Sequence, residues 1–188
     1  DVRIVSAGSP DEEAAVLPSQ PGTGAPTPVK VAEHCADVTA TIIDAASQGL
    51  EVVRLVSGDP FLDGDIGAEA AAVARADHDV DVVPGVTGMT AVPEYAGLAL
   101  HGHDVQLIGD AACQRDIAGR GSTWSANGLV VVNTSAGRVK EVVKHAVASG
   151  RNEDEPAALI CHGATTQQTT HTTTLGELPQ TAKSARLA

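Results

Sequence analysis

The chain has 188 residues, a formal net charge of −12 and only 2% aromatic residues. A hydrophobic fraction of 43% is enough for a substantial core, which must be built almost wholly from aliphatic side chains. So strong a negative balance argues against a nucleic-acid partner, because proteins that bind phosphate backbones concentrate Lys and Arg. No apolar run approaches the ~20 residues that span a bilayer, so we expect no membrane segment.

Cysteine usage points to the redox compartment. The three cysteines are scattered and lack metal-ligand spacing: Cys35, Cys113 and Cys161. This pattern fits a reducing cytoplasm better than a disulfide framework. We therefore expect a cytoplasmic protein.

The first part of the chain predicts a strand, a loop and a helix. Asp1–Ser6 reads as a strand, and residues 7–28 are rich in Pro and Gly without periodicity, as in an exposed or mobile loop. Val29–Gln48 carries apolar residues at helical spacing and is followed by Gly49, a typical helix stop.

The stretch from Val52 to Leu100 predicts two strand–loop–helix units. Val52–Val56 is a β-branched strand that ends in the turn formers of Ser57–Pro60, and Gly67–Ala76 is an alanine-rich helix. A second apolar strand, Val80–Val83, is stopped by Pro84 and Gly85. Thr87 can cap a following helix that turns three apolar side chains towards a core and ends at Gly97; these are Met89, Val92 and Tyr95.

The last part of the chain predicts more strands than helices. Strands are expected at Val105–Ile108, Leu129–Val132, Ala158–Cys161 and Gln167–Leu175, a helix at Val139–Ala148, and an irregular surface excursion over residues 110–127 that contains Trp124. The fold class is therefore α/β. We expect two lobes, 1–100 and 101–188, each a mainly parallel sheet with flanking helices, and ligand binding at the carboxyl ends of the strands.

Four sequence blocks resemble a known family. SGDPF (57–61), VVPGVT (82–87), PEYAGLAL (93–100) and the closing segment from Pro156 to Leu178 are similar, in order and spacing, to blocks of the SAM-dependent tetrapyrrole methylases. The likeness is greatest to uroporphyrinogen-III C-methyltransferases, and within them to the degenerate methylase domain that some bacteria fuse to a uroporphyrinogen-III synthase. Single blocks are weak signals, but four ordered blocks between residues 57 and 178 are a strong one.

The resemblance implies a two-lobed fold with S-adenosyl-L-methionine (SAM) bound in a cleft between the lobes. It also implies an N-terminal lobe that lacks its first strands in this sequence, because the family's opening strand and Gly-rich loop have no counterpart here. The cofactor-binding residues that it implies are Ser57, Gly58, Asp59, Leu62, Thr87, Gly88, Asn133, Gly163 and Ala164. No catalytic residue can be assigned.

Some of these positions depart from the family pattern. Ser57 replaces a Gly, and Asn133 stands where many members have Met, which puts adenine contacts there in doubt. Basic residues of the family are absent from His101-Gly102-His103 and from Gln167-Gln168-Thr169. Asp59 has two readings: its carboxylate could accept from a ligand hydroxyl, or it could be an Asx residue that holds its own loop.

The histidines do not predict a metal site. His101 and His103 would share one face of a strand, but no Asp, Glu or Cys accompanies them at zinc-like spacing. Cys161 and His162 do not predict a nucleophile–base pair, because adjacent strand residues point to opposite faces.

The resemblance implies methylation of uroporphyrinogen III, with SAM as the methyl donor and a tetrapyrrole as the substrate. It also implies a homodimer. Two alternatives stay open: a non-catalytic methylase-like scaffold that is fused to or partners a uroporphyrinogen-III synthase, and a general nucleotide-binding α/β protein. Basic residues in the cleft would favour the enzyme, and an acidic or filled cleft the scaffold. The low count of Lys and Arg predicts that the 188-residue chain alone does not methylate uroporphyrinogen III at neutral pH.

Overall fold

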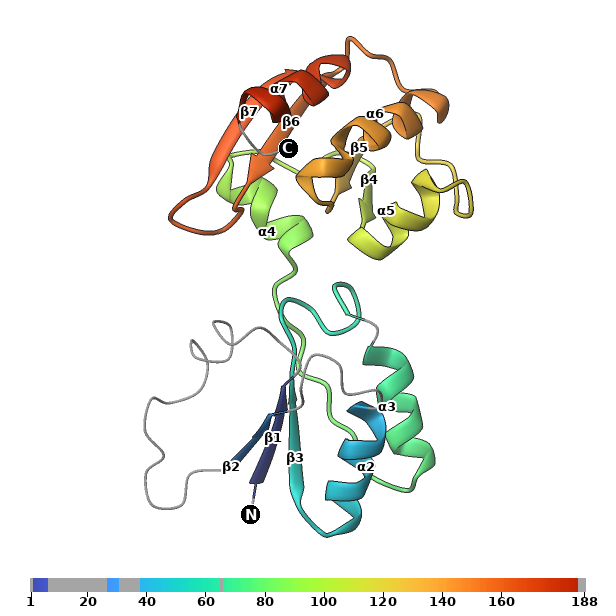
Figure 1. Cartoon of the computed structure of the whole chain (residues 1–188), viewed down its shortest axis with the longest axis vertical. Helices are drawn as coiled ribbons and strands as arrows, with labels where there is room; N and C mark the ends of the chain where they lie inside the picture. The colour runs from blue at the N-terminus through green and yellow to red at the C-terminus, as the bar shows by residue number, and fades with distance from the viewer. Residues whose placement is uncertain (1, 7–26, 31–37, 65, 186–188) are drawn as a thin grey trace. The chain divides into compact units, whose positions relative to one another are not determined.

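The computed structural model describes residues 2–6, 27–30, 38–64 and 66–185. The chain divides into two compact units, Asp1–Val86 and Thr87–Ala188. Figure 1 labels the helices and strands of both units. Among the described residues, no helix is long and apolar enough to cross a membrane.

The first unit contains a parallel three-stranded sheet in the order β2–β1–β3. β1 (Val2–Ser6) and β3 (Glu51–Leu55) confirm two predicted strands to within a residue. β2 (Thr27–Lys30) was not predicted, since it begins inside the Pro/Gly-rich stretch and ends where a helix was expected. Pairing with β1 makes Thr27–Lys30 a strand, and Pro28 is tolerated because β2 is an edge strand of the described sheet.

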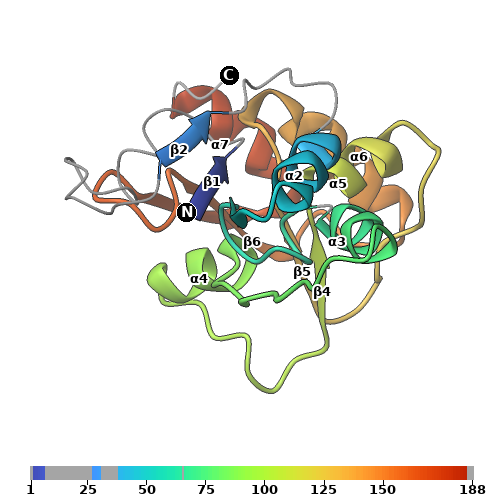
Figure 2. The same ribbon diagram turned by 90° about the horizontal axis from the view of Figure 1, so that it is seen from below.

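Two helices accompany this sheet: α2 (Val38–Ser47) and α3 (Ile66–Arg75). They lie beside each other in both views (Figure 1, Figure 2), and Ile42 of α2 and Val73 of α3 form the buried centre of their contact. α2 confirms the second half of the predicted helix, whereas residues 31–37 of that prediction lie outside the described residues. α3 confirms the predicted alanine-rich helix almost to the residue.

The strand predicted at Val80–Val83 is wrong. Residues 78–87 have no helix or strand assignment, and Val80, Val82 and Val83 are 39%, 37% and 83% exposed. A β-branched run becomes a strand only where a neighbouring strand accepts its hydrogen bonds, and no described strand pairs with this one. The β-branched sequence favours a strand locally, but a strand forms only where a pairing partner is present.

The second unit begins with α4 (Gly88–Tyr95), and the predicted cap of this helix is confirmed. Thr87 Oγ1 accepts a hydrogen bond from the Met89 N–H at 3.2 Å, and Gly97 ends the helix with φ +77°. Met89 is buried as expected, but Tyr95 is 74% exposed, which corrects the prediction that it faces a core. At 100° per residue, Pro93 lies close to Met89 on the helix surface and is buried instead, whereas Tyr95 lies on another face.

A parallel pair of strands, β4 (Val105–Ile108) and β5 (Leu129–Val132), confirms two predicted strands to the residue. The segment between them, predicted to be an irregular surface excursion, instead contains the helix α5 (Asp110–Ile117), and its Trp124 is only 4% exposed. The prediction failed because α5 presents a short buried face that includes a charged residue, Asp116, which sequence reading places at the surface.

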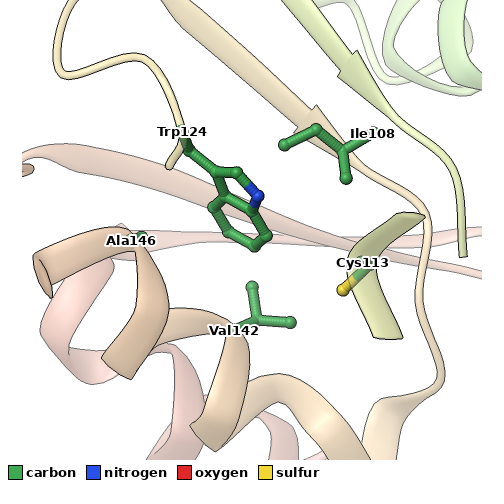
Figure 3. Close-up of a cluster of buried hydrophobic side chains, with 5 residues drawn as sticks. All are labelled: Ile108, Cys113, Trp124, Val142 and Ala146. Atoms are coloured by element: carbon green, nitrogen blue, oxygen red, sulfur yellow. The ribbon is translucent and has the colours of Figure 1, made fainter. Parts of the chain in front are cut away.

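Trp124 lies at the centre of a cluster of buried side chains, which Figure 3 shows: Ile108, Cys113, Trp124, Val142 and Ala146. Its indole N–H donates to Asp116 Oδ2 at 2.7 Å, and Asp116 Oδ1 accepts from the Ser122 N–H at 2.9 Å. A buried carboxylate is stable when its oxygens are hydrogen-bonded in this way. Asp116 thereby fixes the Gly-rich connection from α5 onto the core.

The helix α6 (Val139–Ala148) is confirmed to the residue and carries two apolar stripes. Val142 and Ala146 contact the Trp124 cluster, whereas Val139 and Val143 pack with Leu178 and Ala182. The last two residues belong to α7 (Leu178–Ser184), a helix that the sequence reading missed. α6 therefore joins two separate clusters into the core of this unit.

The closing segment forms an antiparallel hairpin of β6 (Pro156–Cys161) and β7 (Thr169–Thr174). Both strands were predicted, including the threonine-rich one. Short 3₁₀ turns, η1 (Ala136–Arg138) and η2 (Leu175–Glu177), lead into α6 and α7.

The division between the units lies one helix earlier than the predicted boundary at residues 100 and 101. α4 belongs to the second unit because its residues pack there. A Cβ at Gly163 would lie 2.4 Å from Val92, and Met89 approaches Gly109. The chemical character of the chain changes after Leu100, but α4 already contributes to the second core.

We expect Asp116→Ala to lower the free energy of unfolding by about 2 kcal/mol or more, because it leaves a buried indole N–H without an acceptor. Urea denaturation followed by circular dichroism measures the change. Asp104→Ala, at an exposed position of the same unit, should change stability by less than about 0.5 kcal/mol. Equal effects of the two variants would show that the Asp116 bonds do not fix the segment.

Candidate functional site

The loop after β3, residues 57–64, is organised by the Asp59 carboxylate. Oδ1 accepts from the N–H groups of Phe61 and Leu62, both at 3.0 Å, and Oδ2 accepts from the Gly85 N–H at 3.3 Å. Asp59 thus acts as an Asx residue that holds its own loop, and it also bonds Gly85, which follows residues 80–84. Asp59 therefore holds two loops of the first unit together.

A second carboxylate completes this loop. Asp63 Oδ2 accepts from the Asp59 N–H at 2.7 Å. Gly58 has φ +73°, and a Cβ there would lie 2.1 Å from the same Oδ2 atom. A Cβ at Gly85 would lie 2.1 Å from the carbonyl oxygen of Gly58. Gly85 is therefore required for the two loops to approach each other, and Gly58, with its positive φ, for the shape of its own loop, with or without a ligand.

What this loop offers to a ligand is its exposed face. Ser57 and Leu62 are exposed, and Phe61 is 60% exposed. The N–H groups of Asp59, Phe61 and Leu62 are already bonded within the loop. A ligand here would contact the Ser57 hydroxyl, carbonyl groups and apolar surface rather than a cradle of open N–H groups.

In the second unit, Thr87 and Gly88 form the start of α4. Thr87 is 8% exposed, so it acts as the helix cap and not as a surface group. Gly88 is exposed, and a Cβ there would meet only Val92, at 4.0 Å. Gly88 thus leaves an open approach to the helix start that its own fold does not fill.

Asn133 lies at the carboxyl edge of β4 and β5. Its N–H donates to the Ile108 carbonyl at 2.9 Å, and the residue is exposed. Arg138 and Asp110, which the sequence reading did not single out, lie at the same edge: Arg138 Nη1 donates to Asp110 Oδ1 at 2.8 Å. Their position directly after two predicted strands was the signal that could have found them.

Gly163 and Ala164 lie in the turn between β6 and β7. A Cβ at Gly163 would come within 2.4 Å of Val92, so its backbone packs directly on α4. His162 and Ala164 on either side have φ +50° and +58°, a conformation that is uncommon outside glycine. The Ala164 N–H donates to Gln168 Oε1 at 2.7 Å. Two of the predicted positions, Gly88 and Gly163, thus both lie near Val92 of α4.

The described thiols are poor nucleophiles. Burial raises the pKa of the Cys161 thiol and of the Cys113 thiol, and the neighbouring Thr169 and Thr134 hydroxyls only partly oppose this. Cys161 ends β6, while His162 belongs to the turn, so they do not form a nucleophile–base pair. His101 and His103 lie in an exposed turn rather than on a strand. No group of three or more metal-ligating side chains is found among the described residues.

The two units differ strongly in charge. The segment 1–86 carries four Lys or Arg and fifteen Asp or Glu, a formal charge of −11. The segment 87–188 carries eight and nine, a formal charge of −1, and together they account for the total of −12. The first unit therefore favours a cationic ligand, and an anionic ligand must find its counter-charges on the second.

We expect Asp59→Ala to release both loops that its carboxylate joins. Amide hydrogen exchange at Phe61, Leu62 and Gly85 should accelerate, because each of these N–H groups loses its acceptor. Asp81→Ala, an exposed carboxylate of the same unit, serves as the control and should leave these amides unchanged. Unchanged exchange in Asp59→Ala would show that the carboxylate is not needed for the loop and is free for a ligand.

Comparison with known proteins gives one consistent result. Residues 4–179 match the model of the tetrapyrrole (corrin/porphyrin) methylases. The chain is 35% identical over 157 residues to siroheme synthase 1 of Pectobacterium atrosepticum, which covers 79% of this chain and 32% of that protein. It is 30% identical over 152 residues to a uroporphyrinogen-III C-methyltransferase of a Sinorhizobium species, covering 74% of this chain and 52% of that protein. The chain thus spans about a third to a half of the length of these relatives.

Solved structures show the same fold. A cobalt precorrin-4 methyltransferase superposes with a TM-score of 0.73 at 22% identity, over 98% of this chain and 79% of that one. A uroporphyrin-III C-methyltransferase of Thermus thermophilus, solved with S-adenosylhomocysteine, superposes with a TM-score of 0.66 at 22% identity, over 96% and 75%. The predicted α/β fold class is confirmed. The family match covers nearly the whole chain, and the chain belongs to the tetrapyrrole methylases.

Proposed function

We propose that this chain is a SAM-dependent C-methyltransferase domain that acts on uroporphyrinogen III, in the branch of tetrapyrrole biosynthesis that leads to sirohaem and cobalamin. The family match over residues 4–179 carries the proposal. The name of the Sinorhizobium relative supports the substrate, and the S-adenosylhomocysteine in the Thermus thermophilus structure supports the cofactor.

The residues present fit SAM in their chemistry. Exposed positions of the predicted site offer the Ser57 hydroxyl and the Asn133 amide, which are uncharged donors and acceptors suited to a nucleoside, and Gly88 leaves an open approach beside the helix start. The acidic first unit attracts the sulfonium cation, which supplies the methyl group. The protein's part is to align this methyl group with a nucleophilic pyrrole carbon and to exclude water. The predicted cofactor positions on the first unit are Ser57, Gly58, Asp59 and Leu62, and those on the second are Thr87, Gly88, Asn133, Gly163 and Ala164.

The alternative is a non-catalytic scaffold that is fused to or partners a uroporphyrinogen-III synthase. The uncharged residues at Gln167-Gln168-Thr169, where the family has basic ones, favour it. The loop after β3 also favours the scaffold, because its N–H groups are bonded to carboxylates of the same loop and are not open to a ligand. A cytoplasmic homodimer belongs to both versions of the proposal.

Binding of S-adenosylhomocysteine separates the two. We expect measurable but weak binding by isothermal titration calorimetry. Gly88→Val should abolish it, because the new side chain fills the approach at α4 while meeting only Val92 of its own fold. Ala148→Val, at an exposed position near the end of α6, should bind as the wild type does. No heat at about 1 mM ligand, or a binding energy smaller than about 4 kcal/mol, would favour the scaffold.

Gly58 and Gly163 are poor choices for this test. Side chains at these positions would collide with Asp63 and with Val92, so a loss of binding would reflect damage to the fold. Asn133→Met tests for a gain of binding instead of a loss. It restores the residue that many family members have at this exposed position and should strengthen binding if the position contacts the adenine.

Turnover is a separate question. We expect these 188 residues alone to show no conversion of uroporphyrinogen III at neutral pH, because few cations are available to hold a polycarboxylate substrate. Transfer of the labelled methyl group from SAM, followed by chromatography of the tetrapyrroles, measures this. Formation of precorrin-2 by the purified chain would contradict the expectation.

A further inference from the structure

The carboxyl edge of β4 and β5 presents a fixed cation. β4 leads through Gly109 into α5, which begins at Asp110, and β5 leads through residues 133–135 into η1, which ends at Arg138. The ion pair of 2.8 Å between Arg138 Nη1 and Asp110 Oδ1 joins these two strand ends. The guanidinium is thereby held at the edge where parallel α/β sheets bind their ligands.

Both oxygens of Asp110 accept a hydrogen bond in this arrangement, whereas, within the described part of the chain, Arg138 uses only one of its donors. The other oxygen of Asp110, Oδ2, accepts from Gln114 Nε2 at 2.6 Å. Among the described residues, the bond to Asp110 is the one hydrogen bond that the Arg138 side chain makes, and the side chain is 35% exposed. A guanidinium has five N–H donors in a planar fork, so the one bond to Asp110 leaves donors of Arg138 available to a ligand.

Arg151 shows what a purely structural arginine looks like in the same unit. It pairs with Glu155 at 2.6 Å and also donates to the carbonyl oxygens of Ser125 and Gly128. Its side chain is only 16% exposed. The Arg138 pair, by contrast, is exposed enough that its net stabilisation is about 1 kcal/mol or less. Fold stability gives little reason to hold Arg138 in this place.

Charge limits where an anionic ligand can bind. The first unit, at −11, repels anions, whereas the second is close to neutral. Within the second unit, Arg138 is a cation whose position at the ligand edge is fixed by a bond. The exposed amide of Asn133, at the same edge, adds an uncharged donor beside it.

We propose that Arg138, positioned by Asp110, binds a carboxylate of the ligand at the carboxyl edge of β4 and β5. This rests on the proposed function, which supplies two sources of that group: the acetate and propionate side chains of the tetrapyrrole and the amino-acid carboxylate of the cofactor. The planar fork of a guanidinium suits bidentate binding of either. Asp110 keeps the fork at the edge through its ion pair.

The test compares two ligands on the same purified chain. Uroporphyrin III, the stable oxidised form of the proposed substrate, is titrated by fluorescence quenching, and S-adenosylhomocysteine by calorimetry. The variants are Arg138→Gln, Arg138→Lys and Asp110→Asn, with Lys183→Gln on α7 as a control that removes the same charge elsewhere. Circular dichroism melting verifies that each variant is folded.

We expect Arg138→Gln to weaken the binding of one of the two ligands about tenfold or more, as for the loss of a charge-assisted bond. Arg138→Lys should recover part of this, Asp110→Asn should bind as well as the wild type or better, and Lys183→Gln should change binding less than about twofold. A loss confined to uroporphyrin III identifies the substrate as the source of the carboxylate, and a loss confined to S-adenosylhomocysteine identifies the cofactor.

The remaining outcomes are decisive as well. Wild-type affinities for both ligands in folded Arg138→Gln, or no binding of either ligand by the wild type, would overturn the role of Arg138. Binding of uroporphyrin III that depends on Arg138, together with no binding of S-adenosylhomocysteine, would support the carboxylate site while rejecting the proposed methyltransferase function.

Discussion

The Asp59 carboxylate is the interaction on which the predicted cofactor loop of the first unit depends. It accepts three backbone N–H groups, and one of these, from Gly85, ties the loop after β3 to the segment that leads out of the unit. An isolated loop with glycine at position 58 would lose much conformational entropy in holding one shape. The carboxylate offsets that cost, and for this reason Asp59 determines the shape of this loop.

A second carboxylate plays the same part in the other unit. Asp116 accepts from the Trp124 indole and from the Ser122 N–H, and it draws a Gly-rich connection onto the core. α6 then couples that core to the β6–β7 hairpin through its two apolar stripes. The edge that carries Asn133 and Arg138 is therefore attached to a packed core, which is the kind of support that a binding site requires.

The two units differ in charge, and this difference bears on which ligand each unit attracts. A sulfonium cofactor is attracted to the acidic first unit, and a polycarboxylate substrate is repelled by it. The second unit, with eight of the twelve cations, is the part of the chain able to bind the substrate's acids. Under the proposed function, the sulfonium of the donor would be attracted to the first unit and the acids of the acceptor to the second. Arg138 is a cation of the second unit whose position is fixed by an ion pair.

The sequence by itself determined the elements whose signal is local. β4, β5 and α6 were predicted to the residue, because β-branched runs and helical apolar spacing depend only on near neighbours, and Thr87 was recognised as a cap for the same reason. The four family blocks likewise indicated which residues to expect in the site.

Only the tertiary structure decided what depends on a distant partner. The run at Val80–Val83 is β-branched and yet pairs with no described strand. Trp124 is buried with its indole N–H bonded to Asp116, and Arg138 is held at the edge of β4 and β5 by its ion pair with Asp110. Pairing and charge compensation join residues far apart in the chain, and a pattern of neighbouring residues does not contain them.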